Sequence, residues 1–121
     1  MNRTSFRTPN INLIVMGGNI VREPEVKEVG EKKTKFARIT VANNRPYQDK
    51  DGKWQEETTF VDIEVWGAQA KKIEEYCKKG TPIVAEGNLK LNKWENKEGK
   101  TISKLLIHAD KIHILDYPEK K

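Results

Sequence analysis

A strict alternation of side chains runs through residues 58–66, which read Thr-Thr-Phe-Val-Asp-Ile-Glu-Val-Trp. Successive side chains of a β-strand point to opposite faces of the sheet, so the Val, Ile and Val of this segment share one face. An aliphatic row of this kind is typical of a strand that covers a hydrophobic core. The opposite face carries Phe60 and Trp66, and large rings turned away from a core are expected to meet a ligand or a partner. The segment therefore predicts a sheet with one buried face and one binding face.

Four further segments are rich in β-forming residues or alternate in the same way. The Gly17-Gly18 pair in the first of them predicts a bulge or a sharp bend. The charged stretch from residue 22 to about residue 35 is expected to be a turn. Residues 44–57 and 95–100 predict hairpin tips, the first through its Asp51-Gly52 turn signal. With residues 58–66 included, the expected strands are 11–20, 34–43, 58–66, 82–94 and 101–115.

Residues 68–79 show helical periodicity, because their apolar side chains recur every three or four positions. Lys78 and Lys79 would suit the negative end of the helix dipole, and Gly80 the position that follows a helix. Three strands, this helix and two more strands follow one another along the chain. That order predicts an all-β fold of the OB class, a five-stranded Greek-key barrel with a helix between strands three and four.

The overall charge favours a polyanionic partner, since 23 Lys and Arg outnumber 18 Asp and Glu and the net charge is +5. No apolar run approaches the roughly 18 residues of a membrane span, and the first ten residues lack the apolar segment of a signal peptide. We therefore expect a cytoplasmic protein. Cys77 is the only cysteine, which excludes an internal disulfide and fits a reducing compartment.

From residue 11 to residue 115 the sequence resembles the bacterial single-stranded DNA-binding proteins. Residues 13–27, which end in the turn Glu23-Pro24-Glu25 and Val26-Lys27, are similar to the family's first strand and the turn after it. Residues 36–43 are similar to the second strand, and residues 76–80 to the end of the helix. The remaining matches lie at Thr58, Phe60, Trp66-Gly67, residues 86–89, Lys93-Trp94 and Gly99.

The resemblance implies binding and protection of single-stranded DNA, without sequence preference, in replication, recombination and repair. It also implies a homotetramer whose subunits pair through the first strand. The base-stacking residues that it implies are Tyr47, Phe60, Trp66 and Trp94. The phosphate contacts that it implies are Lys27, Lys50, Lys79 and Lys93.

The residues themselves add further candidates to this site. Every base has a π-face, so an exposed ring accepts any base and contributes about 1–3 kcal/mol per stacked base. Trp54 is added as a stacking residue because it lies beside Tyr47 on the same hairpin tip. Cations beside such rings suit a groove that follows a phosphodiester backbone. The further candidate phosphate contacts are Arg38, Lys53 and Lys90.

Two carboxylates, Asp62 and Glu64, are predicted to share the face of Phe60 and Trp66. They would repel phosphate unless they pair with cations from adjacent strands, and Arg38 or Lys90 are the expected partners. Such pairing would also hold those cations in position.

No catalytic constellation is recognisable. His108 and His113 are an odd number of residues apart, which predicts opposite faces of a strand, and no acid is expected near either. Together with Cys77 they lack zinc-site spacing, and the sequence has no glycine-rich phosphate loop. We therefore expect no enzyme, no metal and no cofactor.

The expected organisation is a flexible arm at residues 1–10, one domain at 11–115 and a short charged tail at 116–121. The family usually ends in an acidic tip that docks other proteins, which this sequence lacks, so replication and repair proteins are expected partners only if the full-length protein has that tip. Two other functions stay open: an RNA-binding or primosome-accessory OB-fold protein, and a protein-interaction module in which Phe60 and Trp66 form the interface.

Overall fold

Within residues 6–117, which the computed structural model describes, the chain forms six strands and one helix. The expected arm and tail fall partly outside this range, at residues 1–5 and 118–121. Residues 6–13 belong to no helix or strand. The elements are β1 (Ile14–Ile20), β2 (Glu25–Val29), β3 (Thr34–Gln48), β4 (Trp54–Trp66), α1 (Ala68–Tyr76), β5 (Pro82–Glu95) and β6 (Thr101–Ile114).

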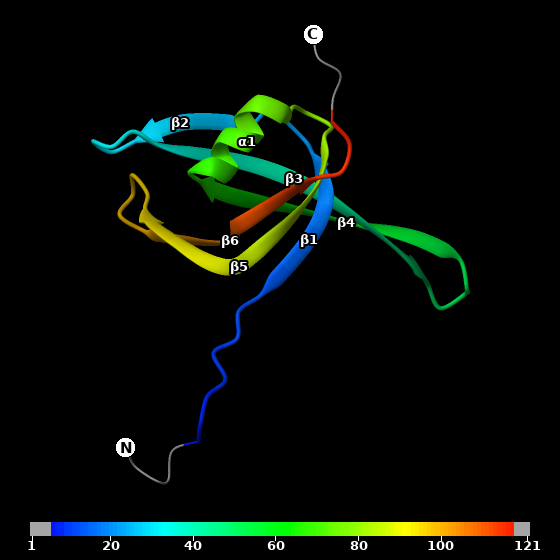
Figure 1. Ribbon diagram of the computed structural model, residues 1–121. Coiled ribbons are helices and arrows are strands. Elements are labelled where there is room, and N and C mark those ends of the chain that lie inside the picture. Colours follow the sequence, from blue (N-terminus) through cyan, green and yellow to red (C-terminus); the bar gives the residue numbers. More distant parts are fainter. Residues whose placement is uncertain (1–5, 118–121) are drawn as a thin grey trace.

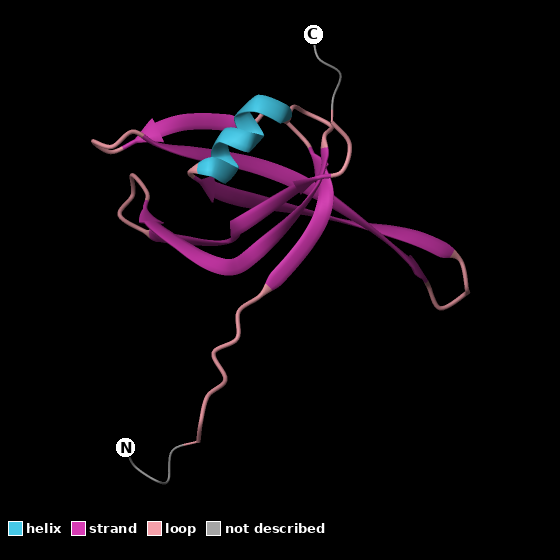
Figure 2. Ribbon diagram, viewed as in Figure 1, coloured by secondary structure: helices cyan, strands magenta, loops and turns pink. Residues whose placement is uncertain are grey.

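Five of these strands close a barrel in the order β1-β5-β6-β4-β3 (Figure 1). The barrel closes where β1 pairs with β3, at Asn19↔Ala42 and Ile20↔Val41. Strands β4 and β6 pair in parallel, and the other pairs are antiparallel. The helix follows the third barrel strand and packs against β3, β4 and β6 (Figure 2). This is the predicted OB-fold barrel.

The aliphatic faces of the strands form the core, as the alternation predicted. Ile63 and Val65 of β4 are fully buried, and Val61 is half-buried at the edge of the same cluster. Ala70 and Ile73 of α1 complete the cluster from the helix. Burying one such Val or Ile side chain stabilises the fold by about 1.5–3 kcal/mol. The core therefore fixes which side chains of β4 point outward.

The expected turn at residues 22–35 is partly wrong, because residues 25–29 form β2. This strand pairs with the outer edge of β3, with Lys27 opposite Phe36, and lies outside the closed barrel. Only Val26 of β2 packs against the core. The segment is mostly charged, so its sequence does not show the apolar alternation that predicts a strand. Backbone hydrogen bonds to β3 stabilise β2 in place of burial.

The helix ends at Tyr76, three residues earlier than predicted. Cys77 has an extended backbone, and its N–H donates to the Ile73 carbonyl. Gly80 has φ +96° in the turn beyond the helix, where its N–H donates to the Ile20 carbonyl over 2.7 Å. Lys78 and Lys79 therefore lie in this turn and not in the last turn of the helix. The first strand also begins later than expected, at Ile14.

A β-bulge in β6 changes which side chains share a face. Ala109 pairs with Gly87 and Lys111 with Glu86, so Asp110 is the extra residue. A bulge shifts the alternation by one position, which places His108 and His113 on the same face. The prediction of opposite faces is therefore wrong.

The backbone of Ile112, beyond the bulge, binds two side chains of α1. The Ile112 N–H donates to Gln69 Oε1 over 2.9 Å, and its carbonyl accepts from Lys72 Nζ over 2.7 Å. These two hydrogen bonds attach the helix to β6.

Candidate nucleic-acid interface

Side chains that point away from the core on β3, β4, β6 and β5 form one surface, here called the outer face. Cross-strand neighbours on it are Phe36 and Trp66, Arg38 and Glu64, and Thr40 and Asp62. The parallel pairing of β4 with β6 adds His108 beside Glu64. The outer face includes Phe36, Arg38, Thr40, Phe60, Asp62, Glu64, Trp66, Lys90, Trp94, Lys104 and His108.

Three predicted stacking residues remain accessible on the outer face. Phe60 is 65% exposed, Trp94 is 44% exposed and Trp66 is 38% exposed. Phe36 is only 8% exposed and packs edge-on against Trp66, with ring centroids 4.6 Å apart. Phe36 therefore supports the Trp66 ring from the side and leaves part of Trp66 open to a ligand.

The two aromatic residues of the β3–β4 hairpin do not form one stacking surface. Tyr47 pairs with Gln55, whereas Trp54 pairs with Gln48, so the two rings lie on opposite faces of the ladder. Trp54 has the same alternation as Phe60. The hairpin extends well beyond the barrel (Figure 1), and the guanidinium of Arg45 lies 5.8 Å from the centre of the Tyr47 ring.

Asp62 is held by three neighbours on the outer face. Its Oδ1 accepts a hydrogen bond from Thr40 Oγ1 over 2.7 Å, and its Oδ2 accepts one from Lys104 Nζ over 2.5 Å. Arg22 Nη2 lies 3.9 Å from Oδ1 and donates to Thr40 Oγ1 over 2.8 Å. Burial alone would raise the pKa of Asp62, but the hydrogen bonds from Lys104 and Thr40 outweigh burial and lower that pKa.

One carboxylate oxygen of Glu64 contacts two basic side chains. Its Oε1 lies 2.9 Å from Lys90 Nζ and 3.3 Å from His108 Nδ1. Burial opposes ionisation of Glu64, yet these partners lower its pKa below the ordinary value. The predicted pairing with Lys90 is confirmed, whereas Arg38 turns toward the Phe36 ring.

Both histidines have an acidic partner, contrary to the sequence prediction. His108 contacts Glu64, and its Nε2 lies 3.9 Å from Asp110. His113 contacts Glu86. The bulge at Asp110 and the parallel pairing of β4 with β6 bring these groups together, and neither is visible as a local sequence pattern.

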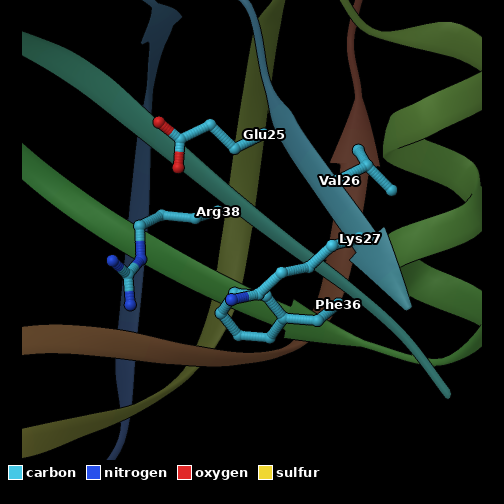
Figure 3. Close-up of a pocket in the computed structure, with 5 residues that line it drawn as sticks. All are labelled: Glu25, Val26, Lys27, Phe36 and Arg38. Carbon is cyan, nitrogen blue, oxygen red and sulfur yellow. The ribbon is translucent and has the colours of Figure 1, made fainter. Parts of the chain in front are cut away.

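A small pocket opens where β2 meets β3 (Figure 3). Its volume is about 90 Å³, and Glu25, Val26, Lys27, Phe36 and Arg38 line it. Lys27 Nζ lies 5.6 Å and the Arg38 guanidinium carbon 5.7 Å from the centre of the Phe36 ring. Among the described residues, Arg38 Nε is buried without a hydrogen-bond partner. Two cations beside the Phe36 ring make this pocket suited to an anionic group.

The other predicted phosphate contacts are exposed but scattered. Lys50 and Lys53 flank the tip of the β3–β4 hairpin, where the Lys53 N–H donates to Asp49 Oδ1. Lys79 lies in the turn after α1, and its N–H donates to Glu23 Oε1. Lys93 pairs with Ser103 and lies on the opposite face from its neighbour Trp94.

Three basic side chains of this surface were absent from the sequence prediction. Arg22 and Lys104 hold Asp62, and His108 holds Glu64. The order of strands in an OB barrel, which places β6 beside β4, is the signal that points to Lys104 and His108. Arg22 lies just after β1, outside any strand pattern.

Residues 6–117 also show whether two other kinds of site are present. No described helix is long and apolar enough to cross a membrane. Within the same residues, no group of three or more His, Cys, Asp or Glu side chains is placed to hold a metal ion.

Burial raises the pKa of the Cys77 thiol to about 11, which keeps this thiol protonated at neutral pH.

The sequence matches a family model described as "Single-strand binding protein family" over residues 11–115. A single-stranded DNA-binding protein of Wolinella succinogenes is 32% identical over 105 residues, which cover 87% of this chain and 64% of that protein. The corresponding protein of Treponema pallidum is 35% identical over 106 residues, which cover 88% of this chain and 58% of that protein. The chain thus spans less than two-thirds of the length of these relatives.

Two solved structures share the fold. A Plasmodium falciparum SSB in complex with ssDNA superimposes with a TM-score of 0.80 at 20% identity, and the match covers 92% of this chain and 100% of that chain. A deletion mutant of the single-stranded DNA binding protein from Thermus aquaticus gives a TM-score of 0.76 at 22% identity, covering 88% and 51% of the two chains. These likenesses confirm the barrel with its helix.

Proposed function

The chain belongs to the single-strand binding protein family, and we propose that it binds and protects single-stranded DNA without marked sequence preference. Such binding serves replication, recombination and repair, in which duplex DNA is opened. The observation that carries the proposal is the exposure of Phe60, Trp66 and Trp94 on an outer face that also bears cations. A core already lies on the other side of β4, so these rings are available to bases.

Base stacking supplies affinity without reading the sequence. A base on Trp66 would meet a ring held in place by Phe36, so little side-chain freedom is lost on binding. Bases on Phe60 and Trp94 would extend the same track. Each stacked base contributes about 1–3 kcal/mol whatever its identity. Tyr47 and Trp54 would meet bases on separate faces of the projecting hairpin.

Phosphate contacts supply the rest of the affinity. Lys27 and Arg38 flank the ring that supports Trp66, so a phosphate next to a base on Trp66 would lie between these cations. Lys90 lies on the outer face as well. A DNA strand that continues over the hairpin and the barrel edges would meet the remaining candidate phosphate contacts, Lys50, Lys53, Lys79 and Lys93.

A salt-dependent titration tests this function. Fluorescence anisotropy of a labelled dT oligomer should rise with protein concentration, and affinity should fall with salt by about 0.7 logarithmic units per phosphate contact for each tenfold increase. A duplex of equal length should bind much more weakly. Titration with an RNA oligomer of equal length compares the affinities for RNA and DNA. Tighter binding of RNA than of dT would favour the RNA-binding alternative. Absence of salt-dependent binding to dT would contradict the proposal.

We also propose that the domain at residues 11–115 assembles as a homotetramer in the cytoplasm, near the nucleoid. One edge of β1 pairs with β5, whereas the other edge pairs with β3 only at Asn19 and Ile20. Ile11 and Leu13 just before β1 and Val15 within it are exposed, and a second subunit would cover them. Sedimentation equilibrium should give four times the chain mass of 14.0 kDa; a monomer would contradict the assembly but not the binding.

The proposed role is a binding role without catalysis. The protonated Cys77 thiol is unsuited to nucleophilic attack at neutral pH. Replication and repair proteins would be partners through an acidic C-terminal tip, if the full-length protein carries one.

A further inference from the structure

We propose that Glu64 and His108 are positioning residues that release Lys90 to the DNA backbone and couple this release to uptake of one proton. The inference rests on the proposed binding of single-stranded DNA and specifies how its site is regulated. It concerns three side chains from three strands, β4, β6 and β5.

Glu64 is the buried member of this group. Its side chain is 7% exposed, whereas the Lys90 side chain is 49% exposed. The flexible stem of a lysine lets its ammonium group move between a buried partner and the surface. Lys90 therefore lies within reach of both the Glu64 carboxylate and a phosphate on the outer face.

Moving Lys90 to a phosphate has a cost at Glu64. A buried carboxylate that loses its counter-charge is strongly destabilised. His108 Nδ1 lies 3.3 Å from the same oxygen that accepts from Lys90. When a proton from solvent binds the imidazole, His108 becomes a cation that donates to Glu64 and replaces the charge of Lys90. The proton ends on a ring nitrogen, and no other covalent bond changes.

The charged groups around His108 are suited to this exchange. Glu64 faces its Nδ1 from β4, and Asp110 of β6 lies 3.9 Å from its Nε2. Lys90 reaches the same site from β5, and Arg38 of β3 lies across the ladder from Glu64. A protonated ring thus has a carboxylate beside each nitrogen, while the two neighbouring cations are free to face phosphate.

The coupling predicts the direction of the pH effect. If the complex holds a proton that the free protein lacks, lowering the pH favours the complex. Histidine is the side chain whose charge ordinarily changes near neutral pH, so binding is to be measured between about pH 5.5 and about pH 7.5. Binding of one proton changes the association constant by up to about tenfold per pH unit.

The test is calorimetric titration of the full chain with a dT oligomer at constant ionic strength. Thymine carries no group that titrates in this range, so the DNA adds no proton of its own. Measurements in two buffers of different ionisation enthalpy give the number of protons taken up. The wild type should take up a measurable fraction of one proton within this pH range and bind several-fold more tightly at its low end.

Three substitutions assign the effect. H108Q should abolish proton uptake and flatten the pH profile of the affinity. E64Q should also flatten this profile, and it should strengthen binding at high pH because Lys90 then lacks its anionic partner. H113Q, which alters the histidine beside Glu86, is the matched control and should keep the wild-type profile. Circular dichroism checks that each variant folds.

Several results overturn the inference. Zero proton uptake by the wild type contradicts it without reference to any variant, as does a folded H108Q protein with an unchanged pH profile. If the wild type fails to bind dT at every pH, the proposed function itself is wrong. Binding without proton uptake leaves that function intact and refutes only the coupling.

Discussion

Phe36 and Trp66 lie opposite each other on β3 and β4, with their ring planes inclined at 62° and their centroids 4.6 Å apart. The two rings have different roles because their burial differs. Phe36 is nearly inaccessible and contributes to folding, whereas Trp66 presents part of its ring to solvent. This contrast between a supporting ring and a binding ring organises the outer face.

Alanine substitutions of Phe36 and Phe60 should separate folding from binding. F36A removes a buried ring and should lower the free energy of unfolding by about 3–5 kcal/mol. F60A removes an exposed ring and should leave unfolding nearly unchanged, but it should weaken binding of dT by about 1–3 kcal/mol. Urea unfolding and anisotropy titration measure the two effects. A stable F60A protein with wild-type affinity would remove Phe60 from the site.

Lys27 should contribute to the salt dependence of binding. K27M removes a cation beside the supporting ring, so the slope of log K against log salt should become shallower by about 0.7. K71M makes the same change of charge on α1, where Lys71 pairs with Glu75, and serves as the control. Equal slopes for K27M and the wild type would show that Lys27 does not contact phosphate.

The lowered pKa of Asp62 should make folding sensitive to acid. Because this pKa is lower in the folded than in the unfolded chain, the unfolded chain binds protons first as pH falls. The contribution of Asp62 to stability is therefore complete above about pH 5 and is lost as pH falls through the folded pKa. In urea unfolding between about pH 6 and about pH 3, D62N and K104M should both show a shallower loss of stability than the wild type. A wild-type slope in both variants would contradict this role of Asp62.

Two adjacent glycines should differ sharply in their tolerance of alanine. A methyl group at Gly18 would collide with the backbone carbonyl of Ala42, at the place where β1 and β3 close the barrel. A methyl group at Gly17 would meet the Val84 side chain at an ordinary 3.4 Å. G18A should therefore lower the free energy of unfolding by at least about 1–3 kcal/mol, whereas G17A should change it little. Similar melting temperatures for the two variants would argue against this close approach.

The barrel and the faces of β4 were predictable because the barrel strands are rich in β-forming residues or alternate in their own sequence. Ile63 and Val65 are buried and Phe60 is exposed, as the pattern of β4 required. The strand β2 was not predictable, since it buries only Val26 and is stabilised by pairing with β3. Its stability comes from a neighbour and not from its own composition.

Apart from the pairing of Glu64 with Lys90, the geometry of the candidate site was predictable only where it depends on one strand. Pairing between strands decides the rest: the register of the β3–β4 hairpin separates Tyr47 from Trp54, and the position of β6 brings Lys104 to Asp62. The bulge at Asp110 reverses the expected placement of His113 relative to His108. Such relations depend on distant segments, and local alternation carries no information about them.

We propose above all that single-stranded DNA lies on the outer face and stacks on Trp66. A variant with W54F and W94F retains Trp66 as its only tryptophan, so its emission reports on this position alone. Titration with a dT oligomer should quench that emission in parallel with the rise in anisotropy of the labelled DNA. Binding detected by anisotropy with unchanged Trp66 emission would place the DNA on another surface and contradict the claim.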